Sequence, residues 1–429
     1  MIAADGDGAD RATPAAAPDD RLLLAALFLA SLALRPQLVG IGPLLPSIQQ
    51  GLGISHSLAG LLSTLIVLSM GLLAPSAFRI ARRSGLRFTI AAALGTIAGF
   101  GVARALVPAA AGVIGLTIPV GIGIAVAQSV MPLAVRQSWP TRPVLATGIY
   151  TAGINGGGAV AAALALPLAA AFGGWRGSLT VFSLATAGLM LGWLGLTRGH
   201  APHVRPVGEP PRLPWRNLNG WLLVGIFSAV TIMYYGLNAW LPSSLAEHGW
   251  SHNEAANVLT VMNAVTVPCT LALAWRGDDF GSRHLWLSLG AGCAVTGLLG
   301  VVLAPAAGWL WAALIGAAIG IMFPSMLTLP LDAADGPEDV GAMAAMMLLG
   351  GYTIGALAPF ALGALRDAAG SFTLAMWLIV ADGLVILGFA LSLTPRRLAR
   401  RITPIIGLSG AGEPGNLAAG ELPEVGKAP

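Results

Sequence analysis

Residues 22–46 read LLLAALFLASLALRPQLVGIGPLLP, an apolar run that contains one charged side chain, Arg35. A run of about 20 apolar residues is long enough to cross the hydrocarbon core of a bilayer as a helix. At about 1.5 Å per helical residue, Arg35 would lie roughly 20 Å along the helix from Leu22, near the middle of the membrane. The stretch therefore predicts a membrane-spanning helix with an intramembrane charge.

The composition of the whole chain indicates a polytopic all-α membrane protein. Hydrophobic residues make up 56% of the 429 residues and charged residues only 10%, whereas soluble domains have about 25% charged residues. The length suits about twelve spans joined by short loops. We expect these spans near 22–46, 57–78, 88–107, 111–134, 144–172, 178–197, 219–245, 254–275, 284–304, 308–330, 340–365 and 372–394.

A segment rich in Pro and Arg separates the sixth expected span from the seventh, and it predicts a linker between two halves. Both ends of the chain have the polar or Gly- and Pro-rich composition of disordered tails. We expect an N-terminal six-helix bundle at 21–197 and a C-terminal six-helix bundle at 219–394, joined by a cytoplasmic linker at 198–218. Cytoplasmic tails are expected at 1–20 and 395–429.

The distribution of basic residues predicts the orientation. All but four of the 23 Lys and Arg residues lie in the tails or in the loops on the same side; the exceptions are Arg35, Arg104, Arg176 and Arg366. Basic residues concentrate on the cytoplasmic side of membrane proteins. We therefore expect a multi-pass protein of the inner (plasma) membrane with both termini in the cytoplasm, and we expect no nucleic-acid partner.

An internal repeat with a constant offset of 196 residues relates the two halves. The triplet Leu45-Pro46-Ser47 matches Leu241-Pro242-Ser243, and Gly85 and Arg87 match Gly281 and Arg283. Two six-span halves in the same orientation imply an axis along the membrane normal, with the substrate held between the halves near the midplane.

The chain resembles the cyanate permease / 2-nitroimidazole transporter (CynX/NimT) family of the major facilitator superfamily over roughly residues 22–394. The segments that carry the resemblance are Leu34-Arg35-Pro36, Gly42-Pro43-Leu44-Leu45, 59–64, Met131-Pro132, Trp139-Pro140, Gly173-Gly174-Trp175-Arg176, Tyr235, Ala239-Trp240-Leu241-Pro242, Gly351-Tyr352, Pro359, Gly363 and Asp367. The resemblance implies the major facilitator fold, with 12 transmembrane helices in two pseudo-symmetric six-helix bundles. It also implies a small cargo, as cyanate and nitroimidazole are for family members.

One loop departs from the superfamily's pattern. The loop after the second span usually carries an Asp followed by a basic residue and Gly, but Arg82 stands at this position, followed by Arg83. The corresponding loop of the second half keeps the acid as Asp278, with Arg283 after it. The resemblance implies a gating role for these four residues, although Arg82 argues against the usual gating contact in the first half.

Arg35 is the leading candidate for binding the substrate. The sequence contains no Asp or Glu from Arg21 to Gly208, so no carboxylate of that half can neutralise it. A charge at the bilayer centre costs at least about 2.5–3.5 kcal/mol. An anionic substrate is the counter-charge that we expect. The alternative is a structural role, in which Arg35 snorkels to an interface or donates to carbonyl groups of a helix broken at Pro36.

Polar side chains in other apolar spans are further candidates for the substrate site. The seventh span carries several within seven residues: Tyr234, Tyr235, Asn238 and Trp240. An apolar wall with hydroxyl and amide groups suits a small polar ligand, and the alternative is an aromatic belt at the membrane interface. Four other spans carry one candidate each, which interhelical hydrogen bonds would explain equally well: Gln128, Asn155, Asn263 and Tyr352.

Two more charged residues lie within spans. Arg104 is near the end of the third span, where snorkelling would explain it. Asp382 lies well inside the twelfth span, where a coupling role competes with a local hydrogen bond. Proton symporters commonly use an intramembrane carboxylate, and the first half has none. Uniport, exchange, or symport of a protonatable substrate is therefore favoured over a proton route through the first half.

These patterns predict a secondary active transporter of a small anionic compound, cyanate-like or carboxylate-like, that works by alternating access with Arg35 as the anion-binding charge. The alternative is efflux of a small neutral drug-like compound such as a nitroimidazole. No enzymatic nucleophile–base set, cofactor motif or metal-ligand constellation is expected. The expected partners are the small-molecule substrate and the lipid bilayer, with the protein as a monomer.

Overall fold

The computed structural model describes residues 20–138, 143–198, 213–276, 283–334 and 337–392. The regular elements in these ranges are helices. They are α1 (Asp20–Leu32), α2 (Pro36–Val39), α3 (Ile41–Leu52), α4 (His56–Ser84), α5 (Leu86–Leu106), α6 (Ala110–Ser138), α7 (Pro143–Ala171), α8 (Trp175–Leu196), α9 (Leu218–Glu247), α10 (His252–Arg276), α11 (Arg283–Leu303), the 3-10 helix η2 (Pro305–Ala307), α12 (Gly308–Ala333), α13 (Pro337–Gly355), α14 (Leu357–Ala369) and α15 (Thr373–Ser392).

Within the described ranges, 12 helical segments are long and apolar enough to cross a membrane. Each of them overlaps one of the spans expected from the sequence. The first runs over Leu22–Leu52 and combines α1, α2 and α3, and the eleventh runs over Asp339–Ala369 and combines α13 and α14. The prediction of an all-α protein with twelve spans is therefore confirmed. Apart from Asp20, the first residue of α1, the predicted tails lie outside the described residues, as does most of the predicted linker.

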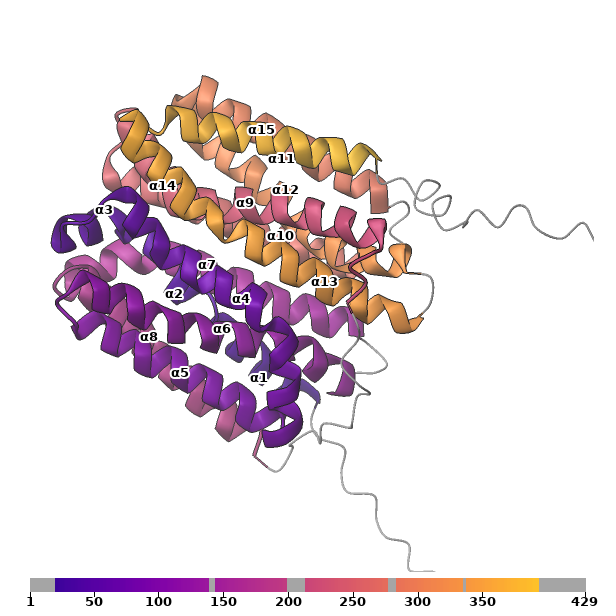
Figure 1. Ribbon diagram of the computed structural model, residues 1–429. Helices are drawn as coiled ribbons and strands as arrows, with labels where there is room; N and C mark the ends of the chain where they lie inside the picture. Colours follow the sequence, from indigo (N-terminus) through magenta and orange to yellow (C-terminus); the bar gives the residue numbers. More distant parts are fainter. Residues whose placement is uncertain (1–19, 139–142, 199–212, 277–282, 335–336, 393–429) are drawn as a thin grey trace, which may run out of the picture.

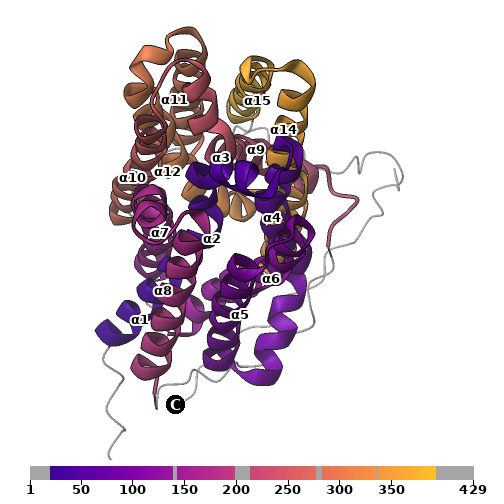
Figure 2. The ribbon, with the colours of Figure 1, turned by 90° about the vertical axis from the view of Figure 1, so that its left-hand side faces the viewer.

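The helices pack into two halves that lie side by side (Figure 1). In the first half α5 packs against α6 and α8, and α1 packs against α7; in the second half α11 packs against α12 and α15, and α9 against α13. The start of α1 and the end of α15 lie at one end of the molecule, which we call the termini end. The end of α3 and the start of α15 lie at the opposite end, the far end, which faces the viewer in Figure 2.

The first span is broken in the middle, and the sequence explains why. Proline has no backbone N–H and its ring clashes with the preceding turn, so Pro36 disfavours the continuation of α1. The chain leaves α1 after Leu32 and begins the four-residue helix α2 at Pro36. The backbone N–H groups of Leu38 and Val39 donate to the carbonyl oxygen of Arg35 at 3.0 and 2.9 Å. Arg35 therefore lies at the break, immediately before α2.

The two halves meet mainly where α4 packs against α13 and α14 and where α7 packs against α10, and α3 also contacts α9. Glycine makes the approach of α4 to α14 possible, because a Cβ atom on Gly60 would collide with the carbonyl oxygen of Pro359. The backbone N–H of Phe360 also donates to Thr64 Oγ1 at 3.2 Å. The candidate substrate residues lie on helices that face this junction.

Candidate substrate site between the two halves

Arg35 is buried and forms its contacts across the junction of the halves. Its side chain is 3% exposed, and Nη1 donates to the hydroxyl oxygen of Tyr235 at 2.9 Å. Its Cζ lies 5.6 Å from the ring centroid of Tyr234 and 5.8 Å from that of Tyr235. In the described part of the chain, Nε is buried without a hydrogen-bond partner, and no carboxylate forms an ion pair with this guanidinium. Snorkelling is therefore excluded for Arg35.

A row of polar aromatic side chains continues from Arg35. The rings of Tyr234 and Tyr235 are 5.0 Å apart, and those of Tyr235 and Tyr352 are 6.4 Å apart. Gln128 Nε2 donates to the hydroxyl of Tyr352 at 2.9 Å, while Gln128 Oε1 is buried and without a partner among the described residues. The row thus connects α2 and α6 of the first half to α9 and α13 of the second.

A second row consists of amides on α9 and α10. The hydroxyl of Tyr234 donates to Asn263 Oδ1 at 3.1 Å, and Asn263 Nδ2 donates to Asn238 Oδ1 at 3.1 Å. A Cβ atom on Gly158 of α7 would lie 3.4 Å from Asn263 Oδ1 and 3.8 Å from Arg35 Cβ. Asn263 and Arg35 therefore flank the same point of α7. We call Arg35, Gln128, Tyr234, Tyr235, Asn238, Asn263 and Tyr352 the central cluster.

Two predicted site residues lie apart from the central cluster. Asn155 Nδ2 donates to Thr270 Oγ1 at 3.2 Å, a contact between α7 and α10. Trp240 is fully buried; its Nε1 donates to the carbonyl oxygen of Pro359 at 2.7 Å, and its ring packs against Phe372 at 5.1 Å. Trp240 therefore belongs to the packing between α9 and α14. Because Trp240 and Tyr235 are buried inside the protein, neither forms an aromatic belt at the membrane surface.

Arg104 does not snorkel, so this expectation was wrong. Its side chain is 1% exposed, and the guanidinium donates to Gln37 Oε1 at 2.6 Å and to Thr117 Oγ1 at 3.2 Å. The reason is that α5 turns Arg104 toward the interior of the first half, where neutral polar groups of other helices accept its hydrogen bonds. The sequence contained one indication of a buried partner for Arg104, because Gln37 is another polar residue of an apolar span in the same acid-free half.

The predicted gating residues have different surroundings. Arg82 and Arg83 are exposed in the last turn of α4 and, with Arg79 and Ile80, line a cavity of about 520 Å³ at the termini end. Arg283 is the first residue of α11, and Asp278 lies outside the described residues. Asp382 is on α15, which packs against α11 and α9. Its Oδ2 atom is buried and accepts no hydrogen bond from the described residues.

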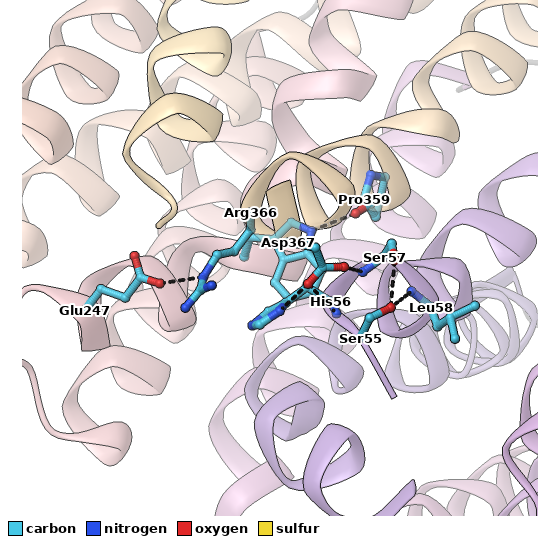
Figure 3. A network of polar contacts seen from close by, with 9 residues as sticks. Ser55, His56, Ser57, Leu58, Glu247, Pro359, Arg366 and Asp367 are labelled. Carbon is cyan, nitrogen blue, oxygen red and sulfur yellow. Dashed lines mark hydrogen bonds and ion pairs between the residues drawn. The ribbon is translucent and has the colours of Figure 1, made fainter. Parts of the chain in front are cut away.

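A polar contact at the far end joins the two halves, and it was not predicted from the sequence. Asp367, near the end of α14, accepts hydrogen bonds from the backbone N–H groups of His56 and Ser57 at 3.1 and 2.9 Å and contacts His56 Nδ1 at 2.7 Å (Figure 3). These are the first two residues of α4, so the carboxylate meets the positive end of the helix dipole. Beside it, Arg366 Nε contacts Glu247 Oε1 at 2.8 Å.

One signal for this contact was available in the sequence. Asp367 is part of the motifs that carry the family resemblance, and it lies at a span end on the side that has few charged residues. Its partner could not be identified from the sequence, because His56 precedes it by 311 residues. We call His56, Ser57 and Asp367 the far-end contact.

Twelve spans in two packed halves, with a buried polar cluster at their junction, define a membrane transport protein. The sequence pattern of the Major Facilitator Superfamily matches residues 23–359. The chain belongs to this superfamily, so it is a multi-pass secondary transporter and not an enzyme.

The comparisons with individual proteins agree with this assignment. The chain is 30% identical over 352 residues to the cyanate transport protein CynX of Escherichia coli (strain K12). The matched residues cover 82% of this chain and 91% of the relative. It is 26% identical over 382 residues to the 2-nitroimidazole transporter of the same organism, covering 87% and 94%. The predicted relationship to cyanate and nitroimidazole transporters is therefore confirmed.

The fold also matches a solved structure. A bacterial homolog of the human lysosomal transporter Spinster, in an inward-facing and unoccupied conformation, superposes with a TM-score of 0.68. The sequences are 18% identical, and the match covers 89% of this chain and 98% of the other. The predicted major facilitator fold is therefore confirmed.

Proposed function

We propose that this transporter moves a small anion, cyanate-like or carboxylate-like, and that Arg35 binds the anion between the two halves. The observation that carries the proposal is the burial of Arg35 without a carboxylate partner in the described structure. A buried cation is costly unless it is paired. Its hydrogen bond to a neutral phenol satisfies one nitrogen but leaves the charge uncompensated, and Nε is still free to donate.

The surroundings of Arg35 support a cargo that is small and singly charged. One guanidinium is the only charged group in the central cluster, and its other members are phenols and amides. Phenol hydroxyls can donate to an anion, and amide groups can donate or accept. The same aromatic rings would pack against the face of a flat cargo. A multiply charged or bulky cargo would lack partners here.

The runner-up is efflux of a neutral nitroimidazole-like compound. The similarity to the 2-nitroimidazole transporter favours it, and so do the three tyrosine rings near Arg35. In that case the bond between Arg35 and Tyr235 would be structural, and the neutral cargo would pack against the rings. The two proposals differ in one measurable respect, which is whether cargo binding needs the charge of Arg35.

A thermal-shift screen of the purified protein tests the proposal. A ligand that binds only the folded state stabilises it by about 2.7 kcal/mol at 100 times its Kd. The screen would compare cyanate, small carboxylates and nitrate with nitroimidazoles, for the parent protein and for Arg35→Gln. We expect the anions to raise the melting temperature of the parent protein alone. Stabilisation by nitroimidazoles alone, equal in both proteins, would support the runner-up.

We further propose that the protein works as a monomer in the plasma membrane with both termini in the cytoplasm. The excess of basic residues in the loops of the termini end supports this orientation. In that orientation Arg82 and Arg83 lie at the cytoplasmic end of α4. We propose that they take part in gating there. Asp278 and Arg283, which belong to the corresponding loop of the second half, would take part with them. A role of Asn155 and Trp240 in substrate binding stays a prediction.

Changing Asp382 to Asn is expected to leave the pH dependence of transport unchanged. Asp382 lies on α15, which packs against α9 and α11 of its own half, and it makes no hydrogen bond to the central cluster through its buried Oδ2. Uptake of the labelled anion into liposomes would be measured for the parent protein and the variant between about pH 5.5 and about pH 8.0. Loss of the pH dependence in Asp382→Asn would instead identify this carboxyl group as the proton carrier.

A further inference from the structure

Arg104 is the second buried guanidinium of the first half, and its hydrogen bonds lead to the helix that carries Arg35. Its Nη2 donates to Gln37 Oε1 at 2.6 Å, a short bond that the positive charge strengthens. The amide nitrogen of Gln37 in turn donates to Ser183 Oγ at 2.8 Å and to the carbonyl oxygen of Leu179 at 3.2 Å. Gln37 is fully buried and uses both ends of its amide.

Gln37 connects α2 directly to two other helices, and Arg104 extends the network to a third. Its partners Arg104 and Ser183 lie on α5 and α8, and Arg104 Nη1 extends the network to Thr117 on α6 at 3.2 Å. The residue on α5 one turn before Arg104 is Gly101. A Cβ atom there would collide with Ser183 Oγ and would lie 3.2 Å from Gln37 Nε2. The side chains of this network therefore fill the space beside Gly101, and a side chain at position 101 would not fit.

The position of α2 depends on such side-chain contacts. A helix of four residues has few hydrogen bonds of its own, and a single turn is unfavourable in isolation. Residues 33–35 separate α2 from α1, so α1 does not hold it in line; Gly40, with a right-handed helical backbone, separates it from α3. Arg35 directly precedes α2 and its carbonyl oxygen accepts the first two backbone bonds of the turn. Any shift of Gln37 would therefore move Arg35.

We propose that Arg104 is a positioning residue for the anion site: through Gln37 it holds α2 so that the guanidinium of Arg35 faces the central cluster. The role of Arg35 in this statement rests on the proposed function. Arg104 itself does not touch the cargo. The first half thus contains one cation for binding and a second, 69 residues later in the chain, for placing the first.

The test compares Arg104→Gln with Arg87→Gln as a matched control. Arg87 is also on α5 and also donates hydrogen bonds to other residues of the first half, here Thr197 Oγ1 at 3.1 Å and the carbonyl oxygen of Leu194 at 2.7 Å, but none of these bonds reaches α2. Loss of either arginine removes bonds between α5 and other helices of the first half. Only the loss of Arg104 removes a bond to Gln37.

Two measurements would be made on both variants in liposomes. The first is uptake of labelled cyanate, for which we expect Arg104→Gln to raise KM about tenfold while turnover at saturation is kept. A merely structural role would lower the maximal rate by reducing the number of active molecules and leave KM unchanged. The second is amide hydrogen exchange of residues 37–40, which needs no cargo. We expect exchange to become at least about tenfold faster in Arg104→Gln, as local opening of α2 becomes easier.

The two measurements separate this proposal from the proposed function. If the parent protein transports neither cyanate nor a small carboxylate, the cargo assignment fails, and hydrogen exchange alone decides on Arg104. Unchanged exchange of α2 in Arg104→Gln, or an unchanged KM for a transported anion, overturns the positioning role. If Arg104→Gln does not fold, Gln37→Leu and Arg104→Lys replace it. We expect Gln37→Leu to reproduce both effects and Arg104→Lys, which keeps a donor, to show smaller ones.

Discussion

Replacing Arg35 with alanine is expected to abolish binding of an anionic cargo while leaving insertion into the membrane intact. The substitution removes the one charge of the central cluster and its bond to Tyr235. Hydrogen bonds to charged groups are worth about 1.5–3 kcal/mol each. Loss of two such bonds to a bound anion would raise its Kd at least about 100-fold, or about 2.8 kcal/mol. Binding to the purified variant and uptake into liposomes would measure the effect.

Two further variants make the result specific. Arg35→Lys keeps the charge but is also expected to fail, because an ammonium cannot bind Tyr235 and an anion with the planar fork of a guanidinium. Tyr235→Phe keeps the guanidinium and removes only its neutral partner, so we expect a smaller loss. An Arg35→Ala protein that binds and moves an anion with the parent KM would show that the charge serves the fold and not the cargo.

Cross-linking the far-end contact is expected to stop transport completely and reversibly. Alternating access requires the two halves to separate at each end in turn. At the far end the first residues of α4 meet Asp367 of α14 directly. Cysteines at positions 56 and 367, in a background with Cys269 and Cys293 changed to Ala, would be joined by a short reducible bifunctional reagent. We expect uptake to fall to the level of empty liposomes and to return after reduction.

The neighbouring ion pair provides a matched control. Glu247 and Arg366 lie on α9 and α14 of the same half, with 2.8 Å between Oε1 and Nε. Cysteines at these two positions would receive the same cross-link at the same end of the molecule without joining the halves (Figure 3). We expect uptake to continue after this cross-link. Continued uptake with complete cross-linking between positions 56 and 367 would show that the far end need not open during transport.

Much of the fold follows from local sequence, for a physical reason. A segment in lipid must satisfy its own backbone hydrogen bonds, so a long apolar run is almost always a helix. This is why all twelve spans were expected, and why the break at Pro36 could be anticipated. The break in the eleventh span, between α13 and α14 at Ala356, was not anticipated, although Pro359 lies three residues after it and cannot donate to the carbonyl oxygen of Gly355. A proline by itself does not show where a helix breaks, because Pro119 and Pro132 lie inside α6.

The candidate site was only partly predictable. Arg35 stood out because a charge in an apolar run is conspicuous, and the tyrosines and amides stood out for the same reason. Their grouping did not follow, because it requires knowing which way each helix faces. Trp240 and Tyr235 are five residues apart on one helix, yet the first packs against Phe372 and the second bonds Arg35. Arg104 was misjudged because its distance from a span end says nothing about its neighbours.

Distance along the chain separates the features that the sequence determines from those that only the tertiary structure determines. Hydropathy and the absence of acids are properties of contiguous residues, and they established the membrane helices and an uncompensated charge in the first half. The partners of the important side chains are 67, 200 and 311 residues away, for Arg104 with Gln37, Arg35 with Tyr235 and His56 with Asp367. Only the packing of the helices brings such pairs within hydrogen-bond distance, because the rotation and tilt of each helix depend on all of its neighbours together.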